Sequence, residues 1–246
     1  MHLGLSAKTI LLDAVRALVQ FLLRYFHQLE VRGQRNVPPS GAVVLISNHG
    51  SYYDPVIIGG VLRRRVCFMA WRGIFSWPVV SWLARAAGAF PIDLQRRHDL
   101  DAYHVALDLL KGGEVLGIFP EGGREPGPFM ESVKLGGLQI AVRGGAPIVP
   151  VSIVGIHDIW PRRRRTPQPS KIAITFHPPI PMPAKSFANW REERAFLEGL
   201  MKQVQGVINT EIAARLREYA KEGYIGASIR RFQLTEGKTG DILQRQ

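Results

Sequence analysis

The amino-acid sequence predicts an α/β fold, a mixed and mostly parallel sheet flanked by helices. Short apolar segments, most of them rich in β-branched or aromatic residues, are bounded by glycine, proline or charged residues. They alternate with stretches of helical length, which is typical of a buried sheet with helices on its faces. The 246 residues are 46% hydrophobic, which suits one globular domain with an appended element.

The boundaries of the predicted elements follow from this alternation. Strands are expected at residues 42–47, 65–70, 88–93, 114–120, 147–154 and 171–177. Helices are expected at residues 55–62, 76–87, 98–111, 133–144 and 189–220. Pro147 and Pro150 indicate that the strand at 147–154 lies at a sheet edge or has irregular hydrogen bonding. We therefore expect a domain over residues 31–220 and a polar tail over residues 221–246.

The first 30 residues predict a separate amphipathic helix. Polar residues within 7–30 recur every three or four positions and form one narrow stripe on a mostly apolar cylinder. They are Asp13, Arg16, Gln20, Arg24 and His27. The charges argue against a membrane span, and no cleavage site of a signal peptide follows. The helix either covers the domain core or lies in the membrane interface with its polar stripe toward water; we expect the interfacial arrangement.

Composition narrows the classes of partner. The formal net charge of +12 favours anionic partners, such as nucleic acid, an anionic membrane surface or a phosphorylated small molecule. Cys67 is the single cysteine, which excludes a disulfide framework and fits a reducing compartment. The histidines show no metal-ligand spacing with carboxylates or cysteine, so we expect no metal site.

The stretch SNHGSYYDP, residues 47–55, follows a predicted buried strand and allows two interpretations. In one, Pro55 occupies the first helical position and Asp54 is the N-cap of the helix. In the other, the Asp54 carboxylate folds back onto one imidazole nitrogen of His49. That contact would fix the tautomer and leave the second nitrogen free to take a proton from a hydroxyl. The two roles are compatible, because a carboxylate has several acceptor positions.

A second chemical signal is the stretch IFPEGGREPG, residues 118–127, which follows another predicted strand. A flexible Gly122-Gly123 backbone beside Arg124 suits a phosphate, because the guanidinium binds it bidentately and glycine N–H groups can add further contacts. The alternative is a tight turn with a surface arginine.

Taken in order, these segments resemble the glycerolipid acyltransferase family, in particular the bacterial 1-acyl-sn-glycerol-3-phosphate acyltransferases. Four sequence blocks support the resemblance, over about residues 40–155. They are the HX4D motif Asn48–Asp54, the segment Gly88–Leu94, the segment Phe119–Glu125 and the segment Val149–Val151. Lys134-x-Gly136 matches a K-x-G that the family has after the third block. The chain departs from the family at Leu94, Gly123 and Glu125, which leaves the identity of the acceptor open.

The resemblance implies transfer of a fatty acyl group in phospholipid biosynthesis. The donor would be acyl-CoA or acyl-carrier protein as a co-substrate, with no cofactor, and 1-acyl-glycerol-3-phosphate would give phosphatidic acid. His49 would be the general base, Asp54 would orient it, and the hydroxyl would attack the thioester directly. Arg124, Gly122 and Gly123 would hold the acceptor phosphate. Three further residues would complete the acceptor site, namely Glu121, Asn48 and Lys134. Of these, Glu121 would orient Arg124 or the acceptor.

The resemblance also implies a location. One substrate stays in the bilayer while the donor is cytosolic, so we expect a peripheral or monotopic protein on the cytoplasmic face of the inner membrane, in contact with membrane lipids. The arginines 63–65 and 162–165 are candidate contacts to lipid phosphates or to an acidic carrier protein, and otherwise solvated loop residues. Trp71, Trp77 and Trp82 would line an acyl groove, lie at the membrane interface or pack in the core.

Three other functions compete with this one. The acceptor could instead be glycerol-3-phosphate, another lysophospholipid or a lyso-aminolipid. A thioesterase or lipid hydrolase would need a nucleophile elbow such as G-x-S-x-G, which is absent. A non-catalytic basic protein bound to nucleic acid or membrane would need the basic residues but not His49 and Asp54, and the sequence has no nucleic-acid-binding motif.

Overall fold

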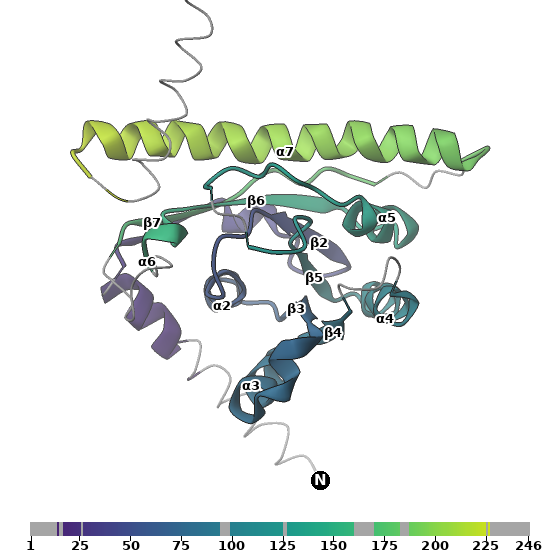
Figure 1. The fold of residues 1–246 in the computed structure, drawn as a ribbon, viewed down its shortest axis with the longest axis horizontal. Coiled ribbons are helices and arrows are strands. Elements are labelled where there is room, and N and C mark those ends of the chain that lie inside the picture. Colours follow the sequence, from purple (N-terminus) through teal and green to yellow (C-terminus); the bar gives the residue numbers. More distant parts are fainter. Residues whose placement is uncertain are drawn as a thin grey trace, which may run out of the picture.

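The structure of the chain is a computed structural model that describes residues 14, 17–25, 27–93, 99–124, 127–159, 170–182, 187–224 and 226. Seven strands in this part of the chain form one sheet with the order β1-β7-β6-β2-β5-β3-β4 (Figure 1). The strands are β1 (Leu29–Arg32), β2 (Val43–Ser47), β3 (Val66–Trp71), β4 (Phe90–Ile92), β5 (Val115–Ile118), β6 (Ile148–Val154) and β7 (Ile172–Phe176).

Most of the sheet runs in one direction. Strand β2 pairs in parallel with both β5 and β6, and β3 is parallel to its neighbours β5 and β4. Strand β7 is antiparallel to β6, and β1 is parallel to β7. The predicted mixed, mostly parallel sheet is therefore confirmed.

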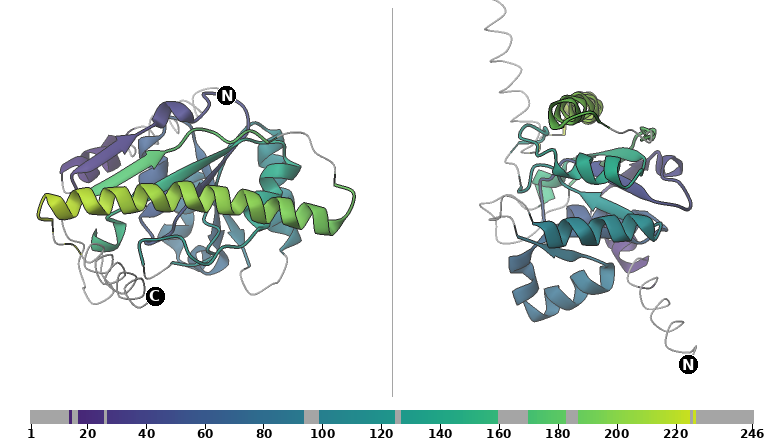
Figure 2. Two further views of the ribbon diagram at one scale, coloured as in Figure 1. Left: turned by 90° about the horizontal axis from the view of Figure 1, so that it is seen from above. Right: turned by 90° about the vertical axis from the view of Figure 1, so that its right-hand side faces the viewer.

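Helices cover both faces of this sheet (Figure 2). They are α2 (Asp54–Val61), α3 (Pro78–Ala87), α4 (Leu100–Lys111), α5 (Gly136–Arg143), α6 (Ile156–Ile159) and α7 (Trp190–Lys221), with 3-10 turns η1 (Gln34–Asn36) and η2 (Arg72–Ser76). Helices α4, α5 and α7 pack on one face, and α2 packs on the other. Alternate residues of β2 enter the two cores, because side chains of a strand point to opposite faces in turn. Strand β2 is thus buried on both sides.

Two of the helices begin at residues whose side chains cap them. The Asp99 carboxylate accepts the Ala102 N–H at 3.1 Å at the start of α4. Asn189 Oδ1 accepts the N–H groups of Arg191 and Glu192, each at 3.0 Å, at the start of α7. Helix α7 then crosses one whole face of the molecule (Figure 2). Its range closely matches the helix predicted at residues 189–220, and the other four predicted domain helices are also present.

Two features of the sheet differ from the prediction. Strand β6 is internal, between β7 and β2, so Pro150 within it and Pro147 just before it do not mark an edge. Pro150 has no N–H to donate, but its carbonyl accepts the His177 N–H at 2.9 Å. Strand β1 was not predicted, and it crosses the boundary expected at residue 30. Glu30 in β1 forms an ion pair with Arg215 of α7, with 3.0 Å between Glu30 Oε1 and Arg215 Nη2. Of the predicted tail, residues 221–224 and 226 are described, and the other residues lie outside the described ranges.

The described part of the N-terminal helix, residues 17–25, packs against α2. Gln20 Nε2 donates to the Gly60 carbonyl at 2.5 Å, and Leu23 is buried in the core under α2. The opposite face exposes four apolar side chains, Leu18, Phe21, Leu22 and Tyr25. The predicted orientation, with Gln20 toward water, is therefore wrong, because this residue faces the domain. No described helix is long and apolar enough to cross a membrane.

Candidate active site

Three loops meet at one edge of the sheet and carry the predicted site residues. Strands β2, β5 and β6 are adjacent and parallel, so their carboxyl ends lie together. Residues 48–53, up to Asp54 at the start of α2, follow β2, residues 119–124 follow β5 and residues 155–159 follow β6. In open α/β sheets, ligands bind outside the carboxyl ends of the strands. The sequence blocks predicted to act together are thus brought together by the topology of the sheet.

Asp54 holds the loop that contains His49. Its buried carboxylate oxygen Oδ2 accepts from His49 Nδ1 at 2.7 Å and from the N–H groups of Gly50 and Ser51 at 2.8 and 2.9 Å. Because Oδ2 is an acceptor, Nδ1 is assigned the proton and Nε2 presents its lone pair. The N-cap interpretation of Asp54 is wrong: the N-cap is Tyr53, without a side-chain cap, and α2 starts at Asp54 itself.

His49 is fixed by two further contacts. Its backbone N–H donates to Glu121 Oε2 at 2.6 Å, and its ring stacks on Phe119 with the centroids 4.2 Å apart. The His49 side chain is 16% exposed, and Nε2 has no hydrogen-bond partner within the described ranges. The backbone, the ring plane and Nδ1 are therefore all held, while Nε2 is left for a ligand. Glu121 thus supports the His49 backbone, and its binding of substrate stays a prediction.

A stack of aromatic rings connects His49 to the sheet. Phe119 stacks on Phe68 of β3, with ring centroids 5.7 Å apart and planes at 8°. Phe68 in turn covers Gly117 of β5, where an added Cβ would overlap the Phe68 ring. The missing side chain at Gly117 is what lets Phe68 lie flat over the strand. Neither Phe68 nor Phe119 was predicted to act at the site, because an apolar residue at a strand end looks like ordinary core.

Asn48 lies under the loop and not at its surface. Its Nδ2 donates to the carbonyls of Ile153 and Pro128 at 2.9 and 3.3 Å, and its Oδ1 accepts the Ile153 N–H at 2.9 Å. The side chain is almost completely buried. The prediction that Asn48 contacts substrate is therefore wrong, and the residue ties the start of the loop to β6 and to the segment after Arg124.

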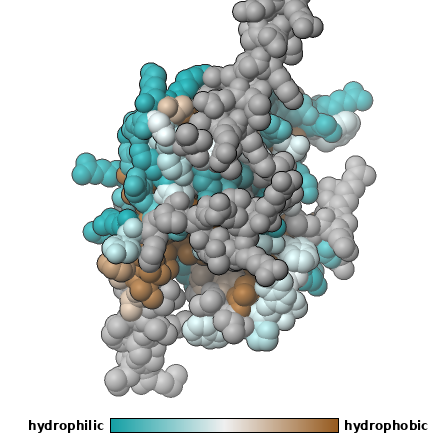
Figure 3. Space-filling view, turned by 60° about the vertical axis from the view of Figure 1, so that its left-hand side comes forward, coloured by the Kyte–Doolittle hydropathy of each residue, from teal (hydrophilic) through white to brown (hydrophobic). Residues whose placement is uncertain are grey.

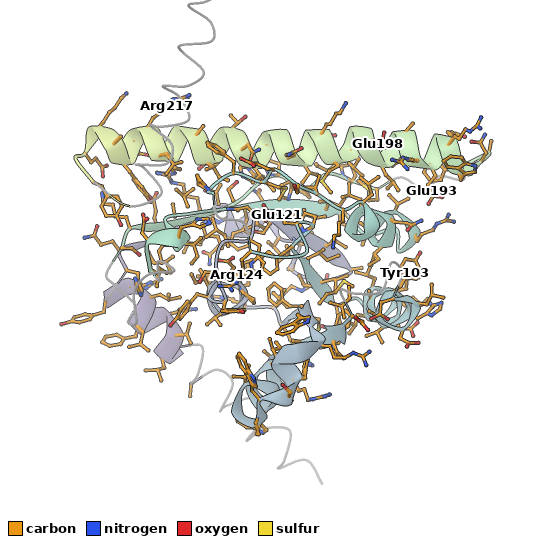
Figure 4. All side chains as sticks on the ribbon, in the orientation of Figure 1. Tyr103, Glu121, Arg124, Glu193, Glu198 and Arg217 are labelled. Atoms are coloured by element: carbon orange, nitrogen blue, oxygen red, sulfur yellow. The ribbon has the colours of Figure 1, made fainter. Side chains whose placement is uncertain are left out.

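The glycine turn carries two positive charges. Gly122 has a left-handed backbone with φ of 68°, and its N–H donates to the Phe119 carbonyl at 3.1 Å. Lys134 lies over this turn, since an added Cβ at Gly122 would come 2.7 Å from Lys134 Nζ. The Arg124 guanidinium stacks over the Tyr52 ring, 3.9 Å from its centroid. Figure 4 labels Glu121 and Arg124 on the ribbon.

Gly50 makes room for a histidine that was not predicted at the site. An added Cβ at Gly50 would lie 2.5 Å from the Cε1 and 2.6 Å from the Nε2 of His157, which belongs to α6. The missing side chain at Gly50 thus leaves space for the His157 ring. His157 therefore packs against the loop that contains His49. A lone histidine after a strand gave no signal in the sequence.

A serine–histidine pair lies elsewhere, in the core. Ser152 Oγ and His177 Nε2 are 2.7 Å apart, and Ser152 Oγ also reaches the Ile208 carbonyl of α7 at 3.3 Å. Ser152 is buried between β6 and α7, which argues against a nucleophile that meets substrate. Among the described residues, no group of three or more His, Cys, Asp or Glu is placed to hold a metal ion.

Several predicted residues lie outside the described ranges. Leu94, Glu125 and the arginines 162–165 are among them. Arg64 is described and is engaged in the fold, because its guanidinium donates to the carbonyls of Pro38, Gly41 and Gly113.

A model of the family described as Acyltransferase matches residues 28–154, slightly more than half of the chain. This match contains β1 to β6 and the site residues that follow β2 and β5, and it ends just before the segment that carries His157. The chain belongs to the Acyltransferase family. The resemblance to glycerolipid acyltransferases that the four sequence blocks indicated is thereby confirmed.

Individual members of the Acyltransferase family are similar to this chain. It is 30% identical over 138 residues to the chloroplastic 1-acyl-sn-glycerol-3-phosphate acyltransferase BAT2 of Brassica napus, covering 55% of this chain and 40% of that protein. It is 32% identical over 162 residues to the human 1-acyl-sn-glycerol-3-phosphate acyltransferase alpha, covering 64% and 56%. The chain thus matches only about two fifths of the length of the plant protein.

The fold of this acyltransferase family member is also found in a solved structure. The 1-acyl-sn-glycerophosphate (LPA) acyltransferase PlsC of Thermotoga maritima superposes with a TM-score of 0.66 and 27% sequence identity. The similarity covers 85% of this chain and 84% of that one.

Proposed function

We propose that this chain transfers a fatty acyl group from acyl-CoA or acyl-carrier protein to the free hydroxyl of 1-acyl-glycerol-3-phosphate, which gives phosphatidic acid. The observation that supports it most is His49, whose Nδ1 is held by the buried Asp54 while Nε2 is left without a partner among the described residues. The names of the similar proteins, which describe the same reaction class, support the choice of acceptor.

In the proposed reaction, His49 moves one proton twice. Nε2 takes the proton of the acceptor hydroxyl as the hydroxyl oxygen bonds to the thioester carbonyl carbon. The buried Asp54 carboxylate stabilises the imidazolium that forms. Collapse of the tetrahedral intermediate breaks the carbon–sulfur bond, and the thiolate takes the proton back from Nε2. Ester and free thiol are the products, and no acyl-enzyme is needed.

The acceptor phosphate would bind at the glycine turn. Arg124 and Lys134 supply positive charge there, and an arginine fork matches phosphate oxygens in two places at once. The N–H of Gly122 is already used within the turn, which leaves the N–H of Gly123 for the ligand. An added Cβ at Gly123 would meet nothing within 4 Å, so the turn also has room for a larger head group. This space keeps other lysophospholipids among the candidate acceptors.

The lipid substrate would reach the site from a membrane surface. Residues 17–25 expose an apolar face, and Trp71, Trp77 and Trp82 around η2 and α3 are 49%, 54% and 62% exposed, which rules out the core-packing alternative for these tryptophans. Figure 3 shows hydrophobic residues, in brown, gathered in the lower left part of the face that it draws. Exposed aromatic and aliphatic side chains on a cationic protein are typical of a surface that rests on anionic lipid. We expect this contact at the cytoplasmic face of the inner membrane.

An assay of product formation tests this proposal. The purified chain is given acyl-CoA, or acyl-carrier protein loaded with an acyl group, and each acceptor in turn: 1-acyl-glycerol-3-phosphate, glycerol-3-phosphate, a lysophosphatidylcholine and a lyso-aminolipid. Phosphatidic acid formed fastest from the first acceptor is the expected result. Free fatty acid without a transfer product would indicate a thioesterase, and faster transfer to another acceptor would replace the proposed one.

A further inference from the structure

Tyr52 and Arg124 connect two loops that are distant in sequence. Tyr52 lies within the loop between His49 and Asp54, after β2, while Arg124 follows β5. The guanidinium carbon of Arg124 is 3.9 Å from the centroid of the Tyr52 ring, well within the range of a cation–π contact. The ring is 58% exposed, so it does not serve as a core residue.

The backbone on both sides of Tyr52 is held firmly. The Asp54 carboxylate binds the N–H groups of Gly50 and Ser51, and the Asp54 N–H donates to the Ser51 carbonyl at 3.2 Å. The Tyr53 N–H donates to Ser51 Oγ at 3.3 Å. Tyr52 is therefore presented by the same contacts that fix His49.

The backbone before Arg124 is held much less. Gly122 and Gly123 precede it, and space is open around Gly123. Among the described residues, the Arg124 guanidinium contacts the Tyr52 ring and makes no hydrogen bond or ion pair. Stacking on Tyr52 thus uses the face of the guanidinium and leaves its N–H donors free for an anion. An ion pair with a carboxylate would neutralise the positive charge of Arg124. Stacking on Tyr52 leaves that charge available to an anion.

We propose that Tyr52 is a positioning residue that holds Arg124 where the acceptor phosphate binds. This inference rests on the proposed function of Arg124. Tyr52 acts through Arg124 on the binding of the acceptor and not on proton transfer by His49. Loss of the ring should therefore raise the acceptor KM by about two- to fivefold, which corresponds to a cation–π contact at an exposed site. The kcat and the donor KM should stay near those of the wild type.

A set of variants separates this role from others. Tyr52→Leu removes the ring, and Tyr52→Phe and Tyr52→Trp keep one. Steady-state kinetics of acyl transfer to 1-acyl-glycerol-3-phosphate give kcat and KM for each variant alone and in an Arg124→Ala background. We expect Tyr52→Leu to raise the acceptor KM, and Tyr52→Phe and Tyr52→Trp to keep it near that of the wild type. In the Arg124→Ala background, Tyr52→Leu should have no further effect on the acceptor KM.

Each contrary result has its own meaning. A Tyr52→Phe variant as weak as Tyr52→Leu would assign the effect to the hydroxyl and overturn the proposal. An additive effect of Tyr52→Leu in the Arg124→Ala background would do so too, as would a fall in kcat, which would indicate a disturbed His49 loop. An Arg124→Ala variant with an unchanged acceptor KM would instead remove the proposed phosphate site itself.

Discussion

The Asp54 carboxylate oxygen Oδ2 accepts His49 Nδ1 at 2.7 Å and, with the same atom, two N–H groups of the loop between the two residues. One buried oxygen thus fixes the tautomer of the base and the shape of the loop that presents it. Removing the whole Asp54 side chain would therefore disturb both the orientation of His49 and the structure of the loop. Removing only its charge separates the two roles.

Replacement of Asp54 by asparagine should lower kcat far more than it changes the acceptor KM. The amide keeps the shape but cannot stabilise the imidazolium, so we expect kcat to fall by about 10²- to 10⁴-fold. Steady-state kinetics measure this, with thermal unfolding to confirm that the variant is folded. Asp101→Asn, an exposed acid on α4, is the matched control. An Asp54→Asn variant with the kcat of the wild type would show that Asp54 is only structural.

The stacked rings of His49, Phe119 and Phe68 should be sensitive to a methyl group added at Gly117. Gly117→Ala places a Cβ against the Phe68 ring, on which Phe119 and then His49 depend. We expect the free energy of unfolding to fall by about 1–3 kcal/mol and kcat to fall with it. Urea unfolding and kinetics measure the two effects.

The control for this change is Gly206→Ala. Gly206 lies in the interior of α7, exposed, and an added Cβ there meets nothing within 4 Å. That variant should gain about 0.5–1 kcal/mol of stability and keep its activity. Equal stability of the two alanine variants would contradict the role of Gly117.

Stability should depend on pH in a specified direction. Burial lowers the pKa of His177 from its ordinary value of 6.5, against a smaller opposite effect of the Glu211 carboxylate, and burial also lowers the pKa of His27. Below pH about 6.5 these two histidines therefore bind more protons in the unfolded chain than in the folded one, and their contribution to the free energy of unfolding decreases as the pH falls. This stability is fully present above that pH.

Replacement of His177 should make the pH dependence shallower. His177→Asn removes one of the two groups, while His104→Asn removes an exposed histidine of α4 and serves as the control. Urea unfolding between pH 5 and 8 measures the slope, in the range where histidine titrates. A slope that is the same in His177→Asn and the wild type would contradict this assignment.

The exposed apolar side chains predict where the chain touches lipid. Phe21→Glu and Trp82→Glu should each weaken sedimentation with phosphatidylglycerol vesicles by about tenfold, because a large side chain leaves the interface and a negative charge enters it. Leu100→Glu, on an equally exposed position of α4, should not. Unchanged binding of the Phe21 variant would remove residues 17–25 from the contact, and unchanged binding of the Trp82 variant would remove α3.

The parts of the fold that the sequence predicted correctly are those with a strong local pattern. The pattern depends only on neighbouring residues in the apolar run of β2, in the periodic α7 and in the alternating strands and helices between these two elements. These elements were predicted to within a few positions. Strand β1 was missed because its four residues include Glu30 and Arg32, whose charges suit a helix end as well as a strand. Its pairing with β7 depends on residues about 140 positions away.

The sequence predicted the contact between His49 and Asp54, but not the other contacts of the site. The spacing of the two residues permits this contact and the family resemblance favoured it, whereas the direction of the Asp54 carboxylate depends on backbone N–H groups that a sequence does not display. Asn48 looked like a ligand-binding amide because its partners, Ile153 and Pro128, are far along the chain. The contacts between Tyr52 and Arg124 and between Gly50 and His157 were not predicted for the same reason, because the partners are far apart in the sequence.

The most direct test of the account is the kcat of His49→Ala in acyl transfer from acyl-CoA to 1-acyl-glycerol-3-phosphate. The variant is compared with the wild type at saturating concentrations of both substrates, after thermal unfolding has shown that it is folded. The account predicts a fall in kcat of at least about 10²- to 10⁴-fold with little change in the acceptor KM, because only proton transfer in the transition state is lost. Transfer by His49→Ala at the rate of the wild type would contradict it.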